Sequence, residues 1–208
     1  MNNKPYIIGI TGGSGSGKSF LCQKIINEMD KDKILIILVD SYYKDLSNIS
    51  FQEREKNNFD HPSSIEFDLL HNHLLQLKQK QPTEIPIYNY KTHTRDKETN
   101  TINKKYSIIL LEGIFALYDN KIRRFLDNSV FIDVPNKLRQ ERRLIRDKKS
   151  RARTVKSIKE QYTKMVMPMY EKHVKPMKKK SNIIIKKFEE NDNGYVKLMN
   201  QIKKKIND

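Results

Sequence analysis

The chain has 208 residues, enough for one domain to bury a good core, and we expect a single domain over residues 1–208. No apolar run approaches the roughly 20 residues of a membrane span and no secretory leader is visible, so a cytoplasmic protein without a membrane partner is predicted. The net charge of +16 raises the question of a nucleic-acid partner. Most of the excess is lysine spread along the chain, which favours a general compositional bias over nucleic-acid binding.

Apolar runs of strand length alternate with amphipathic stretches of helix length, a pattern typical of an α/β fold with a parallel sheet flanked by helices. The run at 34–39 is so uniformly apolar that we expect it to be buried on both faces. Residues about 84–103 alternate apolar and polar side chains and predict a β-hairpin that stands off the sheet. In chain order, strands are expected at 6–11, 34–39, 106–113, 129–134 and 181–187, and helices at 19–29, 65–80, from 135 onward and over 155–180, with a kink near Pro168.

A glycine-rich stretch lies between the first expected strand and the first expected helix. It satisfies G-x-x-x-x-G-K-[ST], the P-loop pattern, in the context that the pattern requires. Glycines let backbone N–H groups turn inward around an anion, and the helix behind adds unpaired N–H groups and the positive end of its dipole. Lys18 is expected to reach the outer phosphates of a nucleoside triphosphate, and the Ser19 hydroxyl to ligate Mg²⁺. The phosphate-binding residues expected are Gly12, Gly13, Ser14, Gly15, Ser16, Gly17, Lys18 and Ser19.

Two acidic residues follow expected strands. Asp40 comes after the run at 34–39, and Glu112 ends the run at 106–113, so both should emerge at the edge of the sheet where the P-loop lies. One carboxylate can serve the Mg²⁺ shell, and the other can take a proton from an incoming hydroxyl. The alternative is that either residue is an ordinary helix cap or loop carboxylate.

Arginines are concentrated in one part of the chain. Ten are present, and six of them fall between 139 and 153. Arginine offers planar, permanently charged contacts that suit phosphate oxygens, so we expect a lid over about 139–153 that closes on a nucleotide. A solvated basic helix face is the alternative. The helical stripe consists of Arg139, Arg142, Arg143 and Arg146, and Arg151 and Arg153 follow it in an expected loop.

The expected hairpin carries Tyr88, Tyr90, His93 and Arg95 at close spacing. Aromatic faces with hydrogen-bonding tips suit a flat heterocycle. Ordinary packing of an alternating ribbon explains the same pattern equally well, so the hairpin alone does not decide between the two interpretations.

Taken together, these motifs resemble those of the uridine/cytidine kinases, a family of P-loop kinases, over nearly the whole chain. The matching blocks are "GITGGSGSGKS", "DSYYKD", "NNFDHP", "PIYNYKTHTR", "LLEGIFALYD", "FIDVP", "RRLIRD", "RAR", "EQYTKMVMPMYEKHVKP" and "SNIII". The resemblance implies a five-stranded parallel sheet, a β-hairpin and a lid. It also implies Mg²⁺-dependent transfer of the γ-phosphate of ATP or GTP to the 5′-hydroxyl of uridine or cytidine in pyrimidine salvage, by a homo-oligomer that is commonly a tetramer.

The resemblance also implies roles for individual residues. Asp40 would be the general base, with Lys18 and Arg146 assisting the transfer of the phosphoryl group. Glu112 would join Ser19 at the metal. Arg151 and Arg153 would face the phosphates of ATP. The nucleoside would be held by Tyr43, Asp60, Tyr88, His93, Arg143 and Gln161, with Asp60 on the ribose hydroxyls and Tyr88 and His93 on the pyrimidine.

Three positions depart from the family pattern. Ala152 stands where the lid motif commonly has glycine, Glu66 stands where aspartate is common, and "KKFEEN" follows "SNIII" in place of a Pro-Arg-Gly turn. Two other functions remain as alternatives. A related kinase of another alcohol, of the phosphoribulokinase type, would phosphorylate a different acceptor. A nucleic-acid-binding NTPase would be stimulated by polynucleotide and would lose affinity steeply with salt.

Overall fold

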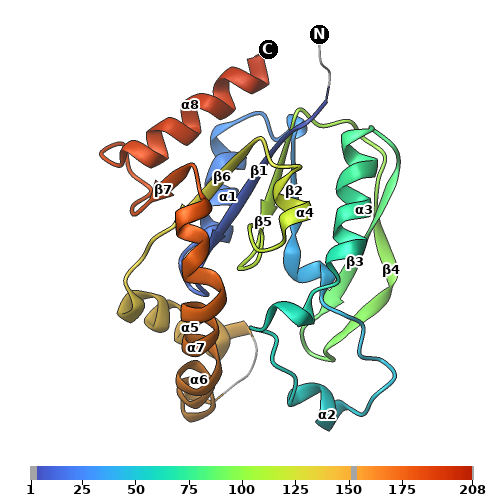
Figure 1. The fold of residues 1–208 in the computed structure, drawn as a ribbon, viewed down its shortest axis with the longest axis vertical. Coiled ribbons are helices and arrows are strands. Elements are labelled where there is room, and N and C mark those ends of the chain that lie inside the picture. Colours follow the sequence, from blue (N-terminus) through green and yellow to red (C-terminus); the bar gives the residue numbers. More distant parts are fainter. Residues whose placement is uncertain (1–3, 151–153, 208) are drawn as a thin grey trace.

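The computed structural model describes residues 4–150 and 154–207, with the backbone alone at 149 and 150. Its centre is a five-stranded sheet in the order β2-β5-β1-β6-β7, in which every neighbouring pair is parallel (Figure 1). This architecture confirms the predicted sheet. The strands are β1 (Tyr6–Gly12), β2 (Ile34–Leu38), β5 (Ile108–Glu112), β6 (Asn128–Ile132) and β7 (Ile183–Ile185).

Helices cover both faces of the sheet, because successive side chains of a strand point to opposite faces. In β1, Ile8 and Ile10 pack in one apolar cluster with α1 (Lys18–Glu28) and α8 (Asn193–Asn207). Ile7 points the other way, into a second cluster with α3 (Phe67–Lys78) and α4 (Asn120–Arg123). Cys22 is buried in the first cluster. Among the described helices, none combines the length and the apolar character that crossing a bilayer would take.

The strand β2 lies at an edge of the sheet, which corrects one expectation. Its run was predicted to be buried on both faces, but Leu38 is 40% exposed and Ile36 is only half-buried. The uniform apolar sequence does not distinguish an edge strand from a central one, because the difference lies in the neighbouring elements. In β5, which lies between β2 and β1, all five residues are buried.

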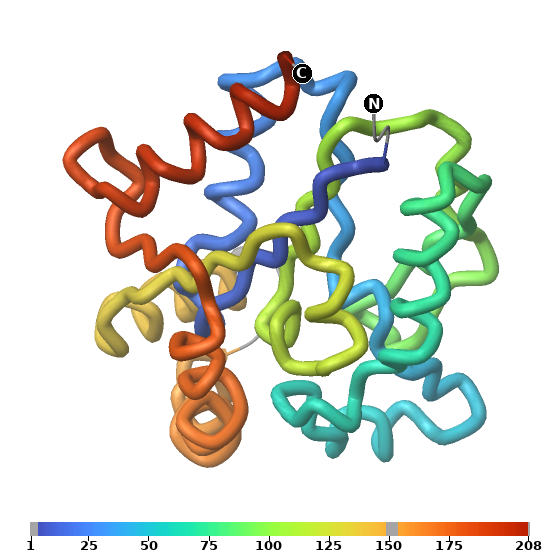
Figure 2. Tube along the Cα trace, turned by 45° about the horizontal axis from the view of Figure 1, so that its top comes forward, coloured from blue at the N-terminus to red at the C-terminus, as the bar shows by residue number. Residues whose placement is uncertain are grey.

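The predicted hairpin forms a separate two-stranded antiparallel sheet of β3 (Thr83–Asn89) and β4 (Thr94–Ile102). Arg95 attaches it to the turn after β2. Its Nε donates to the carbonyl of Tyr43 at 2.9 Å, and its Nη2 pairs with Glu66 at 2.7 Å. In Figures 1 and 2 the chain around the short helix α2 (Phe51–Glu55) and the helices after β6 lie at the end of the sheet where β1 leads into the P-loop.

Between β6 and β7, the described part of the chain is helical almost throughout. It forms α5 (Asn136–Ser150), α6 (Val155–Gln161) and α7 (Met167–Met169), with π-helical turns at Tyr162–Val166 and Tyr170–Val174 on either side of Pro168. Ile158, Tyr162, Val166, Tyr170 and Val174 are all buried and recur every four residues. An α-helix would rotate such a repeat steadily away from the core, whereas the wider π-turns keep it on one face. The helix predicted over 155–180 is therefore present with a different winding.

The loop between β7 and α8 is built around Asp192. Its carboxylate accepts backbone N–H groups from Lys186 at 2.8 Å, Lys187 at 3.0 Å and Tyr195 at 3.0 Å. The bond to Tyr195 caps the first turn of α8, and the other two close the loop on itself. Burial raises the pKa of Asp192, but these backbone donors together act more strongly and hold the pKa below its ordinary value.

We predict that Asp192→Ala lowers the free energy of unfolding by about 1–2 kcal/mol at pH 7, since the substitution removes the cap. A depressed carboxyl pKa contributes stability that is present above the unfolded pKa of about 3.9 and is lost as the pH falls through the folded pKa. The difference between wild type and variant should therefore shrink below about pH 4. Urea unfolding at pH 7 and pH 3.5 measures both effects, with Glu190→Ala, an exposed residue of the same loop, as the control. A loss that is equal at both pH values would contradict the role of the carboxylate.

Candidate functional site

The P-loop joins β1 to α1, and buried hydrogen-bond donors lie along it. Gly15 has φ of 79° and Gly17 has φ of 97°, left-handed conformations that favour glycine. Within the part of the chain that the structure describes, neither the Ser16 hydroxyl nor Nη1 of Arg139 has a hydrogen-bond partner, although both are buried. The Arg139 guanidinium lies where a side chain on Gly13 would be. Buried donors left unmatched at a glycine loop fit an anion that supplies the missing acceptors.

Lys18 and Ser19, at the start of α1, meet the carboxyl end of β5. Lys18 Nζ lies 3.9 Å from Glu112 Oε1, and the Ser19 hydroxyl donates to Glu112 Oε2 at 3.2 Å. Burial lowers the pKa of Lys18, with Glu112 and Asp40 acting in the opposite direction. Burial likewise raises the pKa of Glu112, with Lys18 opposing. The two predicted metal ligands are thus in contact.

A magnesium ion fits this pair of oxygen donors. Glu112 is buried, and burial raises the pKa of its carboxyl, so a cation beside it would stabilise the carboxylate. Mg²⁺ takes oxygen ligands and commonly uses only one or two protein groups beside water and phosphate. The described residues contain no group of three or more His, Cys, Asp or Glu arranged to hold a metal.

Asp40 lies just beyond β2, on a 3₁₀ turn at Val39–Tyr42. Its charge acts on both Lys18 and Glu112, which places it in the electrostatic environment of the P-loop. The hydroxyl of Tyr90, from the hairpin, donates to Asp40 Oδ2 at 3.2 Å. Tyr90 was expected only as one of the hairpin aromatics, and its contact with Asp40 depends on how the hairpin docks.

The predicted nucleoside-binding aromatics come together beside Asp40. The rings of Tyr43 and Tyr88 are 5.0 Å apart, and Phe59 stacks on His93 at 4.8 Å and packs against Tyr43 at 5.3 Å. We call Tyr43, Phe59, Tyr88 and His93 the aromatic cluster. His93 has φ of 56° at the turn of the hairpin, an uncommon conformation for a residue with a side chain. Phe59 was not predicted, although it directly precedes Asp60 in the "NNFDHP" block.

Arg143 connects this cluster to the P-loop. Its Nη1 donates to the Ser14 hydroxyl at 2.9 Å and lies 3.8 Å from Asp60 Oδ1, and its Nη2 donates to Gln161 Oε1 at 3.0 Å. The Arg143 side chain is 5% exposed, so these contacts are made almost without water. Three residues predicted for the nucleoside site, Asp60, Arg143 and Gln161, therefore meet at one point on the phosphate cradle.

A buried carboxylate that sequence reasoning missed lies behind this guanidinium. Asp147, fully buried, pairs with Arg143 Nε at 3.3 Å and with Arg146 Nη2 at 2.8 Å. The available signal was the spacing, since Asp147 follows Arg143 by one helical turn and directly follows Arg146. Asp147 therefore fixes the orientation of two arginines that the sequence predicts to be functional.

Part of the predicted lid packs against the P-loop. Arg139 and Arg143 are buried against the P-loop, and the Arg139 carbonyl lies where a side chain on Gly15 would be. Arg142 is exposed, and the Arg146 side chain is 43% exposed. The expected lid residues Arg151 and Arg153, with Ala152 between them, lie outside the described residues.

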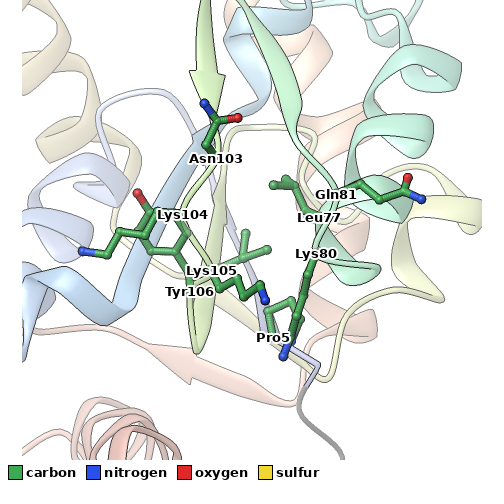
Figure 3. A pocket seen from close by; sticks show the side chains of 9 residues that line it. Pro5, Leu77, Lys80, Gln81, Asn103, Lys104, Lys105 and Tyr106 are labelled. Carbon is green, nitrogen blue, oxygen red and sulfur yellow. The ribbon is translucent and has the colours of Figure 1, made fainter.

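A cavity at the opposite edge of the sheet is too small to hold a substrate. It lies where β1 and β5 begin, is lined by Pro5, Leu77, Lys80, Tyr106 and neighbouring residues, and has a volume of about 10 Å³ (Figure 3). That volume suits at most one water molecule. The candidate active site is instead the P-loop, where buried donors lack partners among the described residues.

Comparisons with known proteins show which family the chain belongs to. The family model described as Phosphoribulokinase / Uridine kinase family matches residues 7–193. The chain belongs to this family. A uridine kinase of Listeria monocytogenes serotype 4a is 42% identical over 92% of this chain and 91% of the relative, and one of Halalkalibacterium halodurans is 40% identical over 89% and 87%. The solved D-glycerate 3-kinase of Cryptococcus neoformans var. grubii covers 81% of this chain and 78% of its own, with a TM-score of 0.62 at 18% identity, which supports the fold.

We predict that Asp147→Asn lowers the free energy of unfolding by about 3 kcal/mol, because it removes the fully buried carboxylate of two arginine ion pairs and leaves Arg143 only its longer ion pair with Asp60. The matched control is Asp68→Asn, whose carboxylate pairs with Lys121 but is 85% exposed and should cost less than about 1 kcal/mol. Urea unfolding of both variants measures the two losses. Equal, small losses would show that Asp147 does not hold the arginines in place.

Proposed function

We propose that this chain is a uridine/cytidine kinase that transfers the γ-phosphate of ATP or GTP to the 5′-hydroxyl of the nucleoside. The observation that carries the proposal is the pair of contacts made by Arg143, to Ser14 of the P-loop and to Asp60 beside the aromatic cluster. One buried cation thereby joins a phosphate seat to a carboxylate suited to a ribose diol, beside aromatic rings suited to a flat base. Relatives named uridine kinase, at about 40% identity over most of the chain, support the same acceptor.

The acceptor half of the proposal rests on chemical fit. The carboxylate of Asp60, whose side chain is 14% exposed, can accept both hydroxyls of a ribose diol. The rings of the aromatic cluster give a pyrimidine faces to stack on and polar tips to bond. An acceptor without the diol or without the ring would leave one of these two surfaces unmatched.

The transfer step follows from the groups at the P-loop. The 5′-oxygen forms a bond to the γ-phosphorus, the bond from that phosphorus to the β,γ-bridging oxygen breaks, and the diphosphate leaves. Asp40 accepts the proton of the 5′-hydroxyl. That hydroxyl would donate to the Asp40 carboxylate as the Tyr90 hydroxyl does in the structure. Lys18 and Arg146 stabilise the charge on the transferred group, with Arg151 and Arg153 assigned to the phosphates as the lid.

Ser19 and Glu112 are the residues that would hold Mg²⁺ in this scheme. The ion supplies charge neutralisation at the phosphates and fixes their orientation. We further propose that the enzyme works in the cytoplasm, in pyrimidine salvage. We expect it to be a homo-oligomer, and analytical ultracentrifugation should give the mass of a tetramer.

An acceptor panel tests the proposal as a whole. A coupled ADP-release assay with uridine, cytidine, adenosine, deoxyuridine and ribulose 5-phosphate should give turnover with the first two. Turnover with ribulose 5-phosphate alone would identify a phosphoribulokinase-type enzyme instead. ATP hydrolysis that needs polynucleotide and no nucleoside would identify a nucleic-acid-binding NTPase.

We predict that Asp40→Asn lowers kcat with uridine by about 100-fold or more, since general-base contributions are of that size, while ATP affinity stays within about 2-fold. The amide keeps an oxygen that can accept from Tyr90, so the fold around the residue should persist. Asp96→Asn, an exposed aspartate of the hairpin, serves as the control. Near-normal turnover of Asp40→Asn would exclude Asp40 as the base.

We predict that deoxyuridine is a poorer acceptor than uridine by at least about 10-fold in kcat/KM, because a buried polar group left unpaired costs about 1–3 kcal/mol. In Asp60→Asn that discrimination should largely disappear, with uridine falling toward the level of deoxyuridine. Steady-state kinetics of both substrates on both proteins measure the change. An unchanged ratio in the variant would place recognition of the 2′-hydroxyl elsewhere.

A further inference from the structure

Two phenylalanines meet at the mouth of the P-loop, on the side away from the aromatic cluster. Phe20, in the first turn of α1, is 60% exposed, and its ring centroid lies 5.4 Å from that of Phe188 with the planes 39° apart. Phe188 belongs to the "KKFEEN" stretch that departs from the family pattern. Its inner side packs against the apolar cluster beneath α1 and α8, so the pair has a fixed base and an open face.

This pair touches the phosphate seat directly. A Cβ built on Gly17 would lie 2.9 Å from Phe188 Cε2 and 3.7 Å from Arg142 Nη1. Gly17 is the residue before Lys18, so the phenylalanines and the Arg142 guanidinium border the loop itself. A nucleoside triphosphate carries its base and its phosphates on one ribose, so its base must bind close to the phosphate seat.

The sheet order separates two aromatic surfaces around the P-loop. The loop leaves the central strand β1, Asp40 and Tyr43 follow the edge strand β2, and Phe188 follows the opposite edge strand β7. Figure 1 shows α1, β7 and α8 on one side and the β3–β4 hairpin on the other. Tyr43 and Tyr88 are buried, whereas Phe20 is open to solvent. The proposed acceptor takes the β2 side, which leaves the β7 side for the donor.

We propose that Phe20 and Phe188 form the stacking platform for the purine base of the donor nucleotide, bordered by the Arg142 guanidinium. Stacking on an aromatic ring is tolerant of base identity, because every base presents a π-face. The platform therefore serves ATP and GTP alike. The inference rests on the proposed function in one respect only, that a nucleoside triphosphate occupies the P-loop.

Binding of nucleotide and of inorganic tripolyphosphate to the full chain, each with Mg²⁺ and measured by calorimetry, separates the platform from the phosphate seat. Base stacking predicts that Phe20→Ala and Phe188→Leu weaken ATP and GTP by about 10-fold to 100-fold, as single aromatic platforms do. Tripolyphosphate, which has no base, should keep its affinity within about 2-fold. Phe188→Leu keeps an apolar side chain on the core, and Phe20→Trp should retain nucleotide affinity.

Leu75→Ala is the matched control, because Leu75 is 40% exposed on α3, away from the P-loop. It should change neither affinity. Unchanged ATP affinity in both platform variants would overturn the inference, and so would an equal loss of ATP and tripolyphosphate. If uridine gives no turnover in the acceptor panel while these variants lose affinity for ATP but not for tripolyphosphate, the proposed acceptor is rejected and the platform is supported.

Discussion

A buried guanidinium is stable only where every side of it meets an acceptor, and Arg143 is the clearest example in this fold. Its partners come from four different segments: Ser14 in the P-loop, Asp60 before α3, Asp147 on its own helix and Gln161 on α6. The full set of contacts forms only when all four segments are in place. The charge therefore makes the geometry of the phosphate cradle depend on the geometry of the proposed acceptor pocket.

The parallel sheet explains why these segments meet. All five strands point their carboxyl ends to one edge, so the loops after β1, β2, β5 and β7 bring the P-loop, Asp40, Glu112 and Phe188 to the same end of the molecule. The burial of Glu112 and Lys18 follows from the central position of β5 and β1 in that sheet. Their shifted pKa values are thus a product of topology as much as of the residues themselves.

Features defined by local sequence could be predicted, and features defined by docking could not. The P-loop pattern and the alternation of apolar runs locate the cradle and the five strands, because both depend on neighbouring residues. The positions of Tyr90 and Phe59 depend on how the hairpin packs against the chain before α3. A local sequence pattern carries no information about that packing. The exposure of Leu38 has the same origin, since an edge strand is defined by the neighbour that it lacks. The pairing of Asp147 with Arg143 could be predicted from their spacing in the sequence. The complete burial of Asp147 could not.

The hairpin hydrogen-bonds into a sheet of its own and shares no ladder with the main one. Its attachment depends on side chains, chiefly Arg95 on the turn after β2 and the packing of Tyr88 on Tyr43. A ribbon held in this manner can be rebuilt by substitution without breaking a single backbone bond of the phosphate-binding core. Substitutions in the hairpin can therefore reshape the proposed acceptor site while the parallel sheet and the P-loop keep their structure.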